Sequence, residues 1–361
     1  MAAFAIVSGV ALREVASAQV YEKLVQDILH VNGKGVDESY VNGQLDRASI
    51  SIPRVALGEG NFRMLGASVN GAQFNNKTAV SASSDYIEVP LLYVYDRTET
   101  LARIMNDKAG YDLLSQKTAN IRRKIARGIN ALTFAVQFSK VLNDAYTSGN
   151  EGDVMTRWDR SAAGAAKKAF VQANVNLSKG DEDLGVDYFP VENRQALISP
   201  DFYGDLFETG SIILNSNLGQ EMLASGVLNP FRNGDASKVE MRNGYCGDLQ
   251  GVPMYQVSPI LWKLAAEFCN VGSAAAPSDV FEGVHAIVCS SWATIRGFSA
   301  SENIEVVPSQ QGQGWVLQPL VHGGCVCVSS KGCQLIVDSE FTNPVTSAGT
   351  AITILAPESR S

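Results

Sequence analysis

Residues 112–146 read DLLSQKTANIRRKIARGINALTFAVQFSKVLNDAY, and this stretch decides the fold. Apolar or small side chains recur along it at spacings of three and four, which predicts a single amphipathic helix. These positions are Leu114, Thr118, Ile121, Ile125, Ile129, Leu132 and Val136. At 1.5 Å per residue such a helix is about 50 Å long, well above the usual length. We expect it to act as a strut, although an ordinary long core helix explains the pattern equally well.

The two halves of this helix differ in their second face. In the first half that face carries Lys117, Arg123, Lys124 and Arg127. In the second half it becomes apolar, with Phe134, Phe138 and Val141. We therefore predict a helix that is exposed on one side at first and buried on two sides later. The basic face either meets carboxylates of a neighbouring molecule, faces DNA, or is simply solvated.

A long hairpin is predicted before the helix. Residues 48–55 alternate as a strand, and 86–95, YIEVPLLYVY, are rich in β-forming residues. Between them, residues 58–84 are rich in Gly, Asn and Ser and contain few large apolar residues. A hairpin with so little core is marginal by itself, so it requires a partner surface.

The N-terminal region is interpreted as an arm. A helix is predicted over 12–31, with Tyr21, Leu24 and Ile28 on its apolar side and Asn32-Gly33 at its end. The apolar start of the chain lacks the preceding positive charge of a signal peptide. No stretch approaches the roughly 20 apolar residues that cross a bilayer. The helix cannot bury its face alone and must dock on the body or on a neighbour.

The remainder is predicted to mix short helices and strands without a linker that divides the chain. A Gly- and acid-rich turn is expected at 179–185. Helices are predicted at 162–177 and 201–208, and strands at 194–199, 252–257, 305–307, 324–328, 334–337 and 351–355.

Composition indicates a globular protein and offers little catalytic chemistry. Of 361 residues, 45% are hydrophobic and 18% charged, and the net charge of −8 argues against a sequence-specific DNA reader. Neither a metal-ligand spacing nor a phosphate-binding loop is present, so no cofactor is expected. Cys325 and Cys327 would share one strand face, which together with Cys333 suggests either a metal, a crosslink or buried small side chains. The last alternative is preferred.

Three phrases in the order of these elements resemble a known family. They are 93–97 (YVYDR), 189–206 (FPVENRQALISPDFYGDL) and 244–259 (GYCGDLQGVPMYQVSP). Together with the arm, hairpin and long helix, they resemble the major capsid proteins of tailed bacteriophages with the Hong Kong 97-type fold. The resemblance covers about residues 48–340.

The resemblance implies an α+β fold with an N-arm, an extended loop, a spine helix in a peripheral domain, and an axial domain. The implied divisions are an arm at 1–47, an extended loop at 48–95, a peripheral domain at 96–189, an axial domain at 190–300, and returning peripheral strands with the C-terminus at 301–361. The implied function is structural, not enzymatic: self-assembly into pentamers and hexamers of an icosahedral shell around phage DNA.

The resemblance also implies partners and contact residues. The expected partners are further copies of this chain, a separate scaffolding protein, a portal, possible decoration proteins and non-specifically bound DNA. The expected location is the virion, with assembly in the host cytoplasm and no membrane. In some relatives a lysine of the extended loop forms an isopeptide bond with a neighbour's asparagine. Lys77 is the candidate here, and the alternative is an ordinary exposed lysine. The residues expected at contacts between subunits are Tyr21, Leu24, Ile28, Lys77, Arg123, Lys124 and Arg127.

Two other functions compete with this interpretation. An encapsulin, a cellular shell of the same fold that encloses cargo enzymes, is the nearest. A thiol enzyme that uses Cys289 or Cys246 as nucleophile is further away, because the sequence shows no base paired with either.

Overall fold

The structure is a computed structural model of the chain. It describes residues 28–38, 49–55, 84–90, 92–95, 99–102, 113–162, 164–182, 185–206, 245–270, 280–298, 304–308, 314–342 and 351–354.

The larger sheet has six strands in the order β5-β14-β10-β6-β8-β7. Neighbouring strands are antiparallel, except that β14 is parallel to β5 and β6 is parallel to β8. The strands are β5 (Met155–Trp158), β14 (Cys333–Asp338), β10 (Val284–Ser290), β6 (Arg194–Ile198), β8 (Val252–Gln256) and β7 (Tyr245–Leu249).

A second sheet is built around β13 (Gly314–Cys327). The first half of β13 pairs with β12 (Ile304–Pro308) and β4 (Glu99–Ala102). Its second half pairs with β11 (Thr294–Phe298) and β3 (Leu92–Tyr95). β13 then continues through residues 328–332 into β14 of the larger sheet, so this short turn joins the two sheets.

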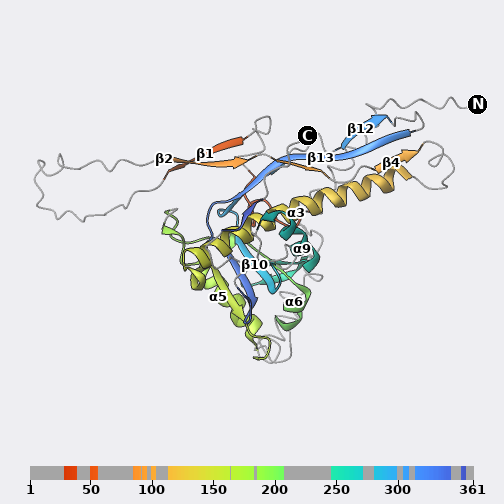
Figure 1. Ribbon diagram of the computed structural model, residues 1–361. Coiled ribbons are helices and arrows are strands. Elements are labelled where there is room, and N and C mark those ends of the chain that lie inside the picture. Colours follow the sequence, from red (N-terminus) through yellow and green to blue (C-terminus); the bar gives the residue numbers. More distant parts are fainter. Residues whose placement is uncertain are drawn as a thin grey trace, which may run out of the picture.

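The predicted hairpin is present as a two-stranded ribbon. β1 (Ser49–Val55) pairs antiparallel with β2 (Ser84–Pro90), in register from Ser49 opposite Pro90 to Val55 opposite Ser84. Figure 1 shows this ribbon projecting away from the body, on the side opposite β4 and β12. Residues 58–83 of the predicted loop, including Lys77, lie outside the described residues.

The long helix is α3 (Leu113–Thr147), close to the predicted 112–146. It runs beside β13 (Figure 1). The predicted stripe is buried at Ile121, Ile125, Ile129 and Leu132. In the second half, Phe134, Phe138 and Val141 are buried as well, which confirms the predicted change from one buried side to two.

The six-stranded sheet is covered on both faces. Leu197, Ile287 and Leu335 point toward α3 and α9 (Pro259–Glu267), in one apolar cluster. Ile198, Val288 and Ile336 belong to a second cluster, which includes residues of α5 (Ala165–Leu177) and α6 (Pro200–Leu206). The alternation along each strand therefore divides the core into two layers.

Two predictions need correction. The helix predicted over 12–31 does not extend to Val31, because residues 28–31 are not helical; their backbone groups bond to side chains of the body instead, as described below. No helix is predicted after the strand 252–257, but α9 begins there, with Ser258 as its N-cap and Pro259 in its first turn. Most other predicted elements match the structure to within a few residues, but β13 begins ten residues before the predicted strand 324–328. The strands β4, β5, β7, β10 and β11 correspond to no predicted element.

Candidate assembly surfaces

The end of the N-terminal arm is clamped inside the subunit by amides. The Gln195 side chain donates to the Leu29 carbonyl (Nε2 to O, 2.6 Å) and accepts from the Val31 amide (2.8 Å). The Leu29 amide donates to Asn130 Oδ1 on α3 at 3.0 Å. Gly35 lies so close that a Cβ there would be 2.4 Å from Gln195 Oε1. The clamp replaces the helical hydrogen bonds expected for residues 28–31.

Arg296 of β11 completes this clamp. Its buried guanidinium donates to the His30 carbonyl at 3.0 Å and forms an ion pair with Glu38 at 2.6 Å. The backbone of Asp37 bonds to that of Thr294 (2.8 Å) and Arg296 (2.9 Å), which adds a short bridge to β11. Residues 28–38 are thus part of the subunit's own core.

One of the arm residues expected at contacts lies at the edge of this clamp, because Ile28 is half-buried there. Tyr21 and Leu24 lie outside the described residues. Residues 29–31 are buried in the subunit, so a contact with a neighbour through this part of the arm is left to Ile28 and the residues before it.

The basic face of α3 is accessible. Arg123 and Arg127 are exposed and Lys124 is half-buried. Within the part of the chain that the structure describes, neither arginine forms an ion pair. Arg123 and Arg127 therefore present positive charge that the described part of the subunit does not pair.

A second exposed surface lies at one end of the six-stranded sheet. We call it the sheet-end surface and define it by Val175, Tyr188, Val191 and Trp292, whose exposed fractions are 48%, 59%, 39% and 48%. These are four of the five large exposed hydrophobic residues among the described positions. Exposed aromatic and apolar groups gathered in this way are typical of interaction sites.

Hydrogen bonds explain why these residues lie at the same end. The Phe189 amide donates to the Leu177 carbonyl at 3.1 Å, and the Ser291 amide to the Asn193 carbonyl at 3.0 Å. Buried Arg194 joins the same loops, because its guanidinium donates to the carbonyls of Phe189 and Asn174. Arg194 of the phrase 189–206 therefore ties the end of α5 to the start of β6.

Exposed carboxylates flank the sheet-end surface. Glu182, Asp187 and Glu192 are exposed, and none of the three forms an ion pair within the described ranges. The surface thus combines apolar area with negative charge, the opposite sign to the α3 face.

The two surfaces are remote from each other within one subunit. Ser330, in the turn beside the sheet-end surface, donates to Asp144 near the end of α3 at 2.7 Å. Asp144 follows Arg123 by 21 positions (144 − 123) and Arg127 by 17 (144 − 127) on the same helix. At 1.5 Å per residue these offsets are about 31 and 26 Å. Direct contact between the surfaces therefore requires two copies of the chain.

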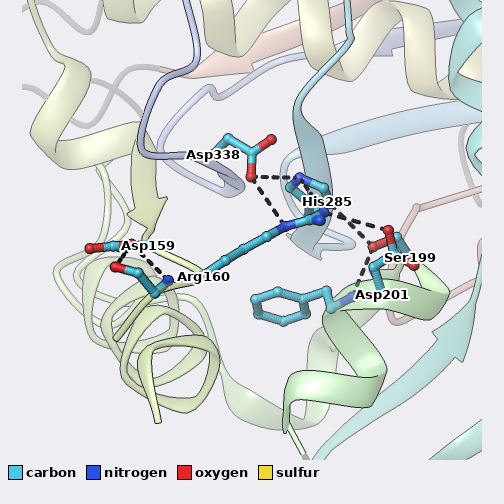
Figure 2. A network of polar contacts seen from close by, with 8 residues as sticks. Asp159, Arg160, Ser199, Asp201, His285 and Asp338 are labelled. Atoms are coloured by element: carbon cyan, nitrogen blue, oxygen red, sulfur yellow. Dashed lines mark hydrogen bonds and ion pairs between the residues drawn. The ribbon is translucent and has the colours of Figure 1, made fainter. Parts of the chain in front are cut away.

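A polar network lies at the opposite end of the six-stranded sheet, where β10 begins and β6 and β14 end (Figure 2). His285 Nε2 contacts Asp338 Oδ1 at 2.9 Å, and His285 Nδ1 lies 3.5 Å from Ser199 Oγ. Arg160 is within 3.7 Å of Asp338 and 3.5 Å of Asp201, and its guanidinium stacks over Trp158.

This serine, histidine and aspartate do not form a usable catalytic triad. Ser199 is buried, and its Oγ accepts a hydrogen bond from the Phe202 amide at 3.2 Å, in the first turn of α6. A nucleophile needs an accessible oxygen within hydrogen-bond reach of its base. The network instead fastens α6, β10 and β14 together.

The cysteines are free thiols. Cys325 and Cys327 are both buried on β13, as predicted for small side chains on a strand face. Burial raises the pKa of Cys289 to about 12 and that of half-buried Cys246 to about 12, so neither is an activated nucleophile. Among the described residues no group of His, Cys, Asp and Glu side chains is arranged to hold a metal ion. The described helices also include none that is long and apolar enough to cross a membrane.

Comparison with known proteins supports the fold. No protein-family model matches the chain, and no curated protein matches it. A solved structure from Microbacterium phage Oxtober96 has a TM-score of 0.52 with 10% identity, covering 86% of this chain and 94% of that chain.

Two further solved structures are similar at lower scores. The capsid of Ralstonia phage GP4 has a TM-score of 0.49 and 11% identity, covering 87% of this chain and 94% of that chain. The mature capsid of bacteriophage PhiM1 has a TM-score of 0.47 and 11% identity, covering 87% and 89%. The α+β fold of the Hong Kong 97 type predicted from the sequence is confirmed.

Proposed function

We propose that this chain is a major capsid protein, a structural subunit that assembles with copies of itself into the closed icosahedral shell of a tailed bacteriophage. One observation carries the proposal: a chain with this fold projects the β1–β2 ribbon, which pairs with no other described strand. A two-stranded ribbon is marginally stable in water, and a neighbouring copy supplies the surface that it lacks.

The subunit surfaces suit a contact that repeats around a ring. The α3 face with Arg123, Lys124 and Arg127 is basic, whereas the sheet-end surface is apolar and acidic. Two different patches that meet between copies form a head-to-tail interface, which generates a closed ring when the rotation closes. Arginine also stacks on exposed aromatic rings such as Trp292. We infer that the α3 face of one copy meets the sheet-end surface of the next.

The remaining contacts and partners belong to the same proposal. Tyr21, Leu24 and Ile28 would bind a neighbour through the arm, and Lys77 lies near the expected tip of the loop. The shell would hold DNA without reading its sequence, and a separate scaffolding protein, a portal and possible decoration proteins would act with it. Assembly would take place in the host cytoplasm and the final location would be the virion.

No specific observation favours a second function. Burial raises the pKa of Cys289 and of Cys246, so neither candidate thiol is an activated nucleophile. The solved structures named above come from phages, and none is a cellular compartment.

The test is assembly of the purified full-length chain. Light scattering after size exclusion and electron microscopy, over a range of salt and protein concentrations and with the scaffolding protein, should show rings of five and six subunits and closed shells. A strictly monomeric protein in every condition would overturn the proposal. Shells that contain host enzymes instead of DNA when isolated from their source would favour the encapsulin alternative.

A further inference from the structure

The turn between the two sheets holds two thiols close together. Cys327 ends β13 and Cys333 begins β14, and their Sγ atoms are 3.9 Å apart. Both side chains are buried. A disulfide needs the two sulfurs at about 2.05 Å, so the sulfurs must come closer by about 1.9 Å than the 3.9 Å that separates them here.

The intervening turn is fixed by several hydrogen bonds, which keep the thiols in place. Ser329 Oγ donates to Asp181 and accepts from the Gly332 amide at 3.2 Å. Ser330 Oγ donates to Asp144 at 2.7 Å, and the Cys333 amide donates to the Ser330 carbonyl at 3.0 Å.

Close packing holds the same turn from the other side. A Cβ at Gly332 would lie 2.5 Å from Ala293 Cβ and 2.9 Å from the Phe189 ring. The turn therefore has little freedom to separate the two sulfurs, and intramolecular reaction between groups held in this way is strongly favoured.

The other thiols are less well placed. Cys289 is opposite Cys333 in the β10–β14 pair, but its Sγ donates to the Gln195 carbonyl at 3.7 Å. Cys325 shares the strand face of Cys327 and has no described thiol in contact. The Cys327 and Cys333 thiols share a hydrogen bond, which lowers the pKa of Cys327 and raises that of Cys333. Cys327 Sγ also lies within hydrogen-bond distance of the Ser329 carbonyl, at 3.3 Å. Cys327 is therefore the member of the pair that ionises first.

We propose that Cys327 and Cys333 form a peroxide-dependent disulfide that staples the junction of the two sheets. The Cys327 thiolate attacks one oxygen of hydrogen peroxide, which gives a sulfenic acid and releases hydroxide, protonated to water. The Cys333 sulfur then attacks the Cys327 sulfur, the S–O bond breaks, and a second water leaves with the Cys333 proton. The two thiols lose two electrons in total, and the peroxide is reduced to two waters.

The chain contains a convenient cleavage site for the test. Lys331 lies between the two cysteines and is followed by Gly332, so trypsin separates Cys327 and Cys333 onto different peptides. The full-length protein is treated with hydrogen peroxide, its remaining thiols are alkylated in denaturant, and the digest is mapped by mass spectrometry with and without reductant. We expect a Cys327–Cys333 linked peptide pair that disappears on reduction.

Matched controls separate this pair from random oxidation. Cys325→Ser, two residues away on the same strand, should leave the linked pair unchanged, whereas Cys327→Ser and Cys333→Ser should abolish it. Protein oxidised in denaturant should give a mixture of cysteine pairs. The ratio of the Cys327–Cys333 pair to all other pairs should be at least about tenfold lower there than in the folded protein. The staple should also raise the melting temperature by about 3–5 °C, because it restricts the unfolded chain.

Three results would overturn the proposal. They are the absence of any linked peptide from folded wild-type protein, a Cys289–Cys333 pair in its place, and a Cys327–Cys333 pair that is no more abundant than in denatured protein. The mapping uses the wild-type chain, so a variant that fails to fold does not leave the question open. The outcome is also independent of shell assembly, because the staple lies within one subunit.

Discussion

Arg296 on β11 pairs with Glu38 at 2.6 Å, although the two residues are 258 positions apart in the chain. The Arg296 side chain is only 1% exposed, so its charge depends on this carboxylate and on the His30 carbonyl. The pair fastens the end of the N-terminal arm to the sheet around β13, which makes the first residues of the fold dependent on one of its last strands.

Breaking this pair should be costly. Arg296→Met is expected to lower the free energy of unfolding by about 3–5 kcal/mol, since it leaves buried polar groups without their partner. Glu38→Gln should cost about 1–3 kcal/mol. Denaturant unfolding, followed by circular dichroism and fluorescence together, measures both. Lys179→Met is the matched control, because Lys179 and its partner Asp153 are exposed and such pairs contribute about 0–1 kcal/mol. Equal losses for Arg296→Met and Lys179→Met would contradict the assignment.

Two truncations divide the N-terminal region at the clamp. Removal of residues 1–27 should leave the secondary structure and the melting temperature nearly unchanged but impair assembly. Removal of residues 1–38 should destabilise the subunit itself, because Leu29, Val31 and Val36 are buried in its core and Gln195 loses both backbone partners. Circular dichroism and size-exclusion light scattering of the two proteins give the answer. Normal shells from the protein without residues 1–27 would show that these residues are dispensable for assembly. An unchanged melting temperature in the protein without residues 1–38 would contradict a stabilising role of the clamp.

Alkaline pH should weaken the fold through the buried thiols. Burial raises the pKa of Cys269, Cys289 and Cys325 to about 12, above the ordinary value near 9. Because the folded pKa is the higher one, their stabilising contribution is complete below about pH 9 and is lost as the pH rises toward 12. Each thiol should remove about 1.4 kcal/mol per pH unit in that interval. Urea unfolding at pH 8, 9.5 and 10.5 tests this. In Cys289→Ala the free energy of unfolding should fall less steeply with pH than in the wild type, by the contribution of one thiol proton. A free energy of unfolding that stays constant to pH 10.5 would contradict the expectation.

Regular periodicity explains which elements the sequence predicts. The α3 stripe and the alternation in β1 are strong local patterns, and both were found. β10 reads VHAIVCS and is buried at every position, so it has no polar alternation to reveal a strand. α9 is not among the predicted helices, although Ser258-Pro259 is a standard helix start.

The surfaces could be predicted only in part. The basic face of α3 follows from helical spacing alone, and Arg123 and Arg127 are exposed as that spacing implies. The sheet-end surface joins α5, two loops and the turn at Trp292, which no local pattern brings together. The clamp depends on Gln195 and Leu29, 166 positions apart. The domain boundaries and the roles of all seven expected contact residues stay predictions; these residues are Tyr21, Leu24, Ile28, Lys77, Arg123, Lys124 and Arg127.

Charge reversal tests the proposed contact between copies. Arg123→Glu with Arg127→Glu should reduce shell yield strongly, and more at low salt than at high salt, because exposed charges are screened within about 10 Å at 0.1 M. Restoring opposite charge with Glu182→Lys and Glu192→Lys should recover part of the yield if the α3 face meets the sheet-end surface. Shell yield is measured by sedimentation and electron microscopy at two salt concentrations.

A control variant and the possible outcomes of the arginine variant distinguish a contact between subunits from contact with DNA and from simple solvation. Lys263→Glu, at an exposed position of α9, changes net charge on a helix that belongs to neither surface and should leave the yield unchanged. Full yield with poor DNA retention in the arginine variant would assign the α3 face to the packaged DNA. Loss of yield that the lysine substitutions do not restore would place the partner of α3 elsewhere on the neighbouring subunit. Unchanged yield and unchanged DNA content at both salts would show that Arg123 and Arg127 are simply solvated, because a repeated interface cannot tolerate like charges at every copy.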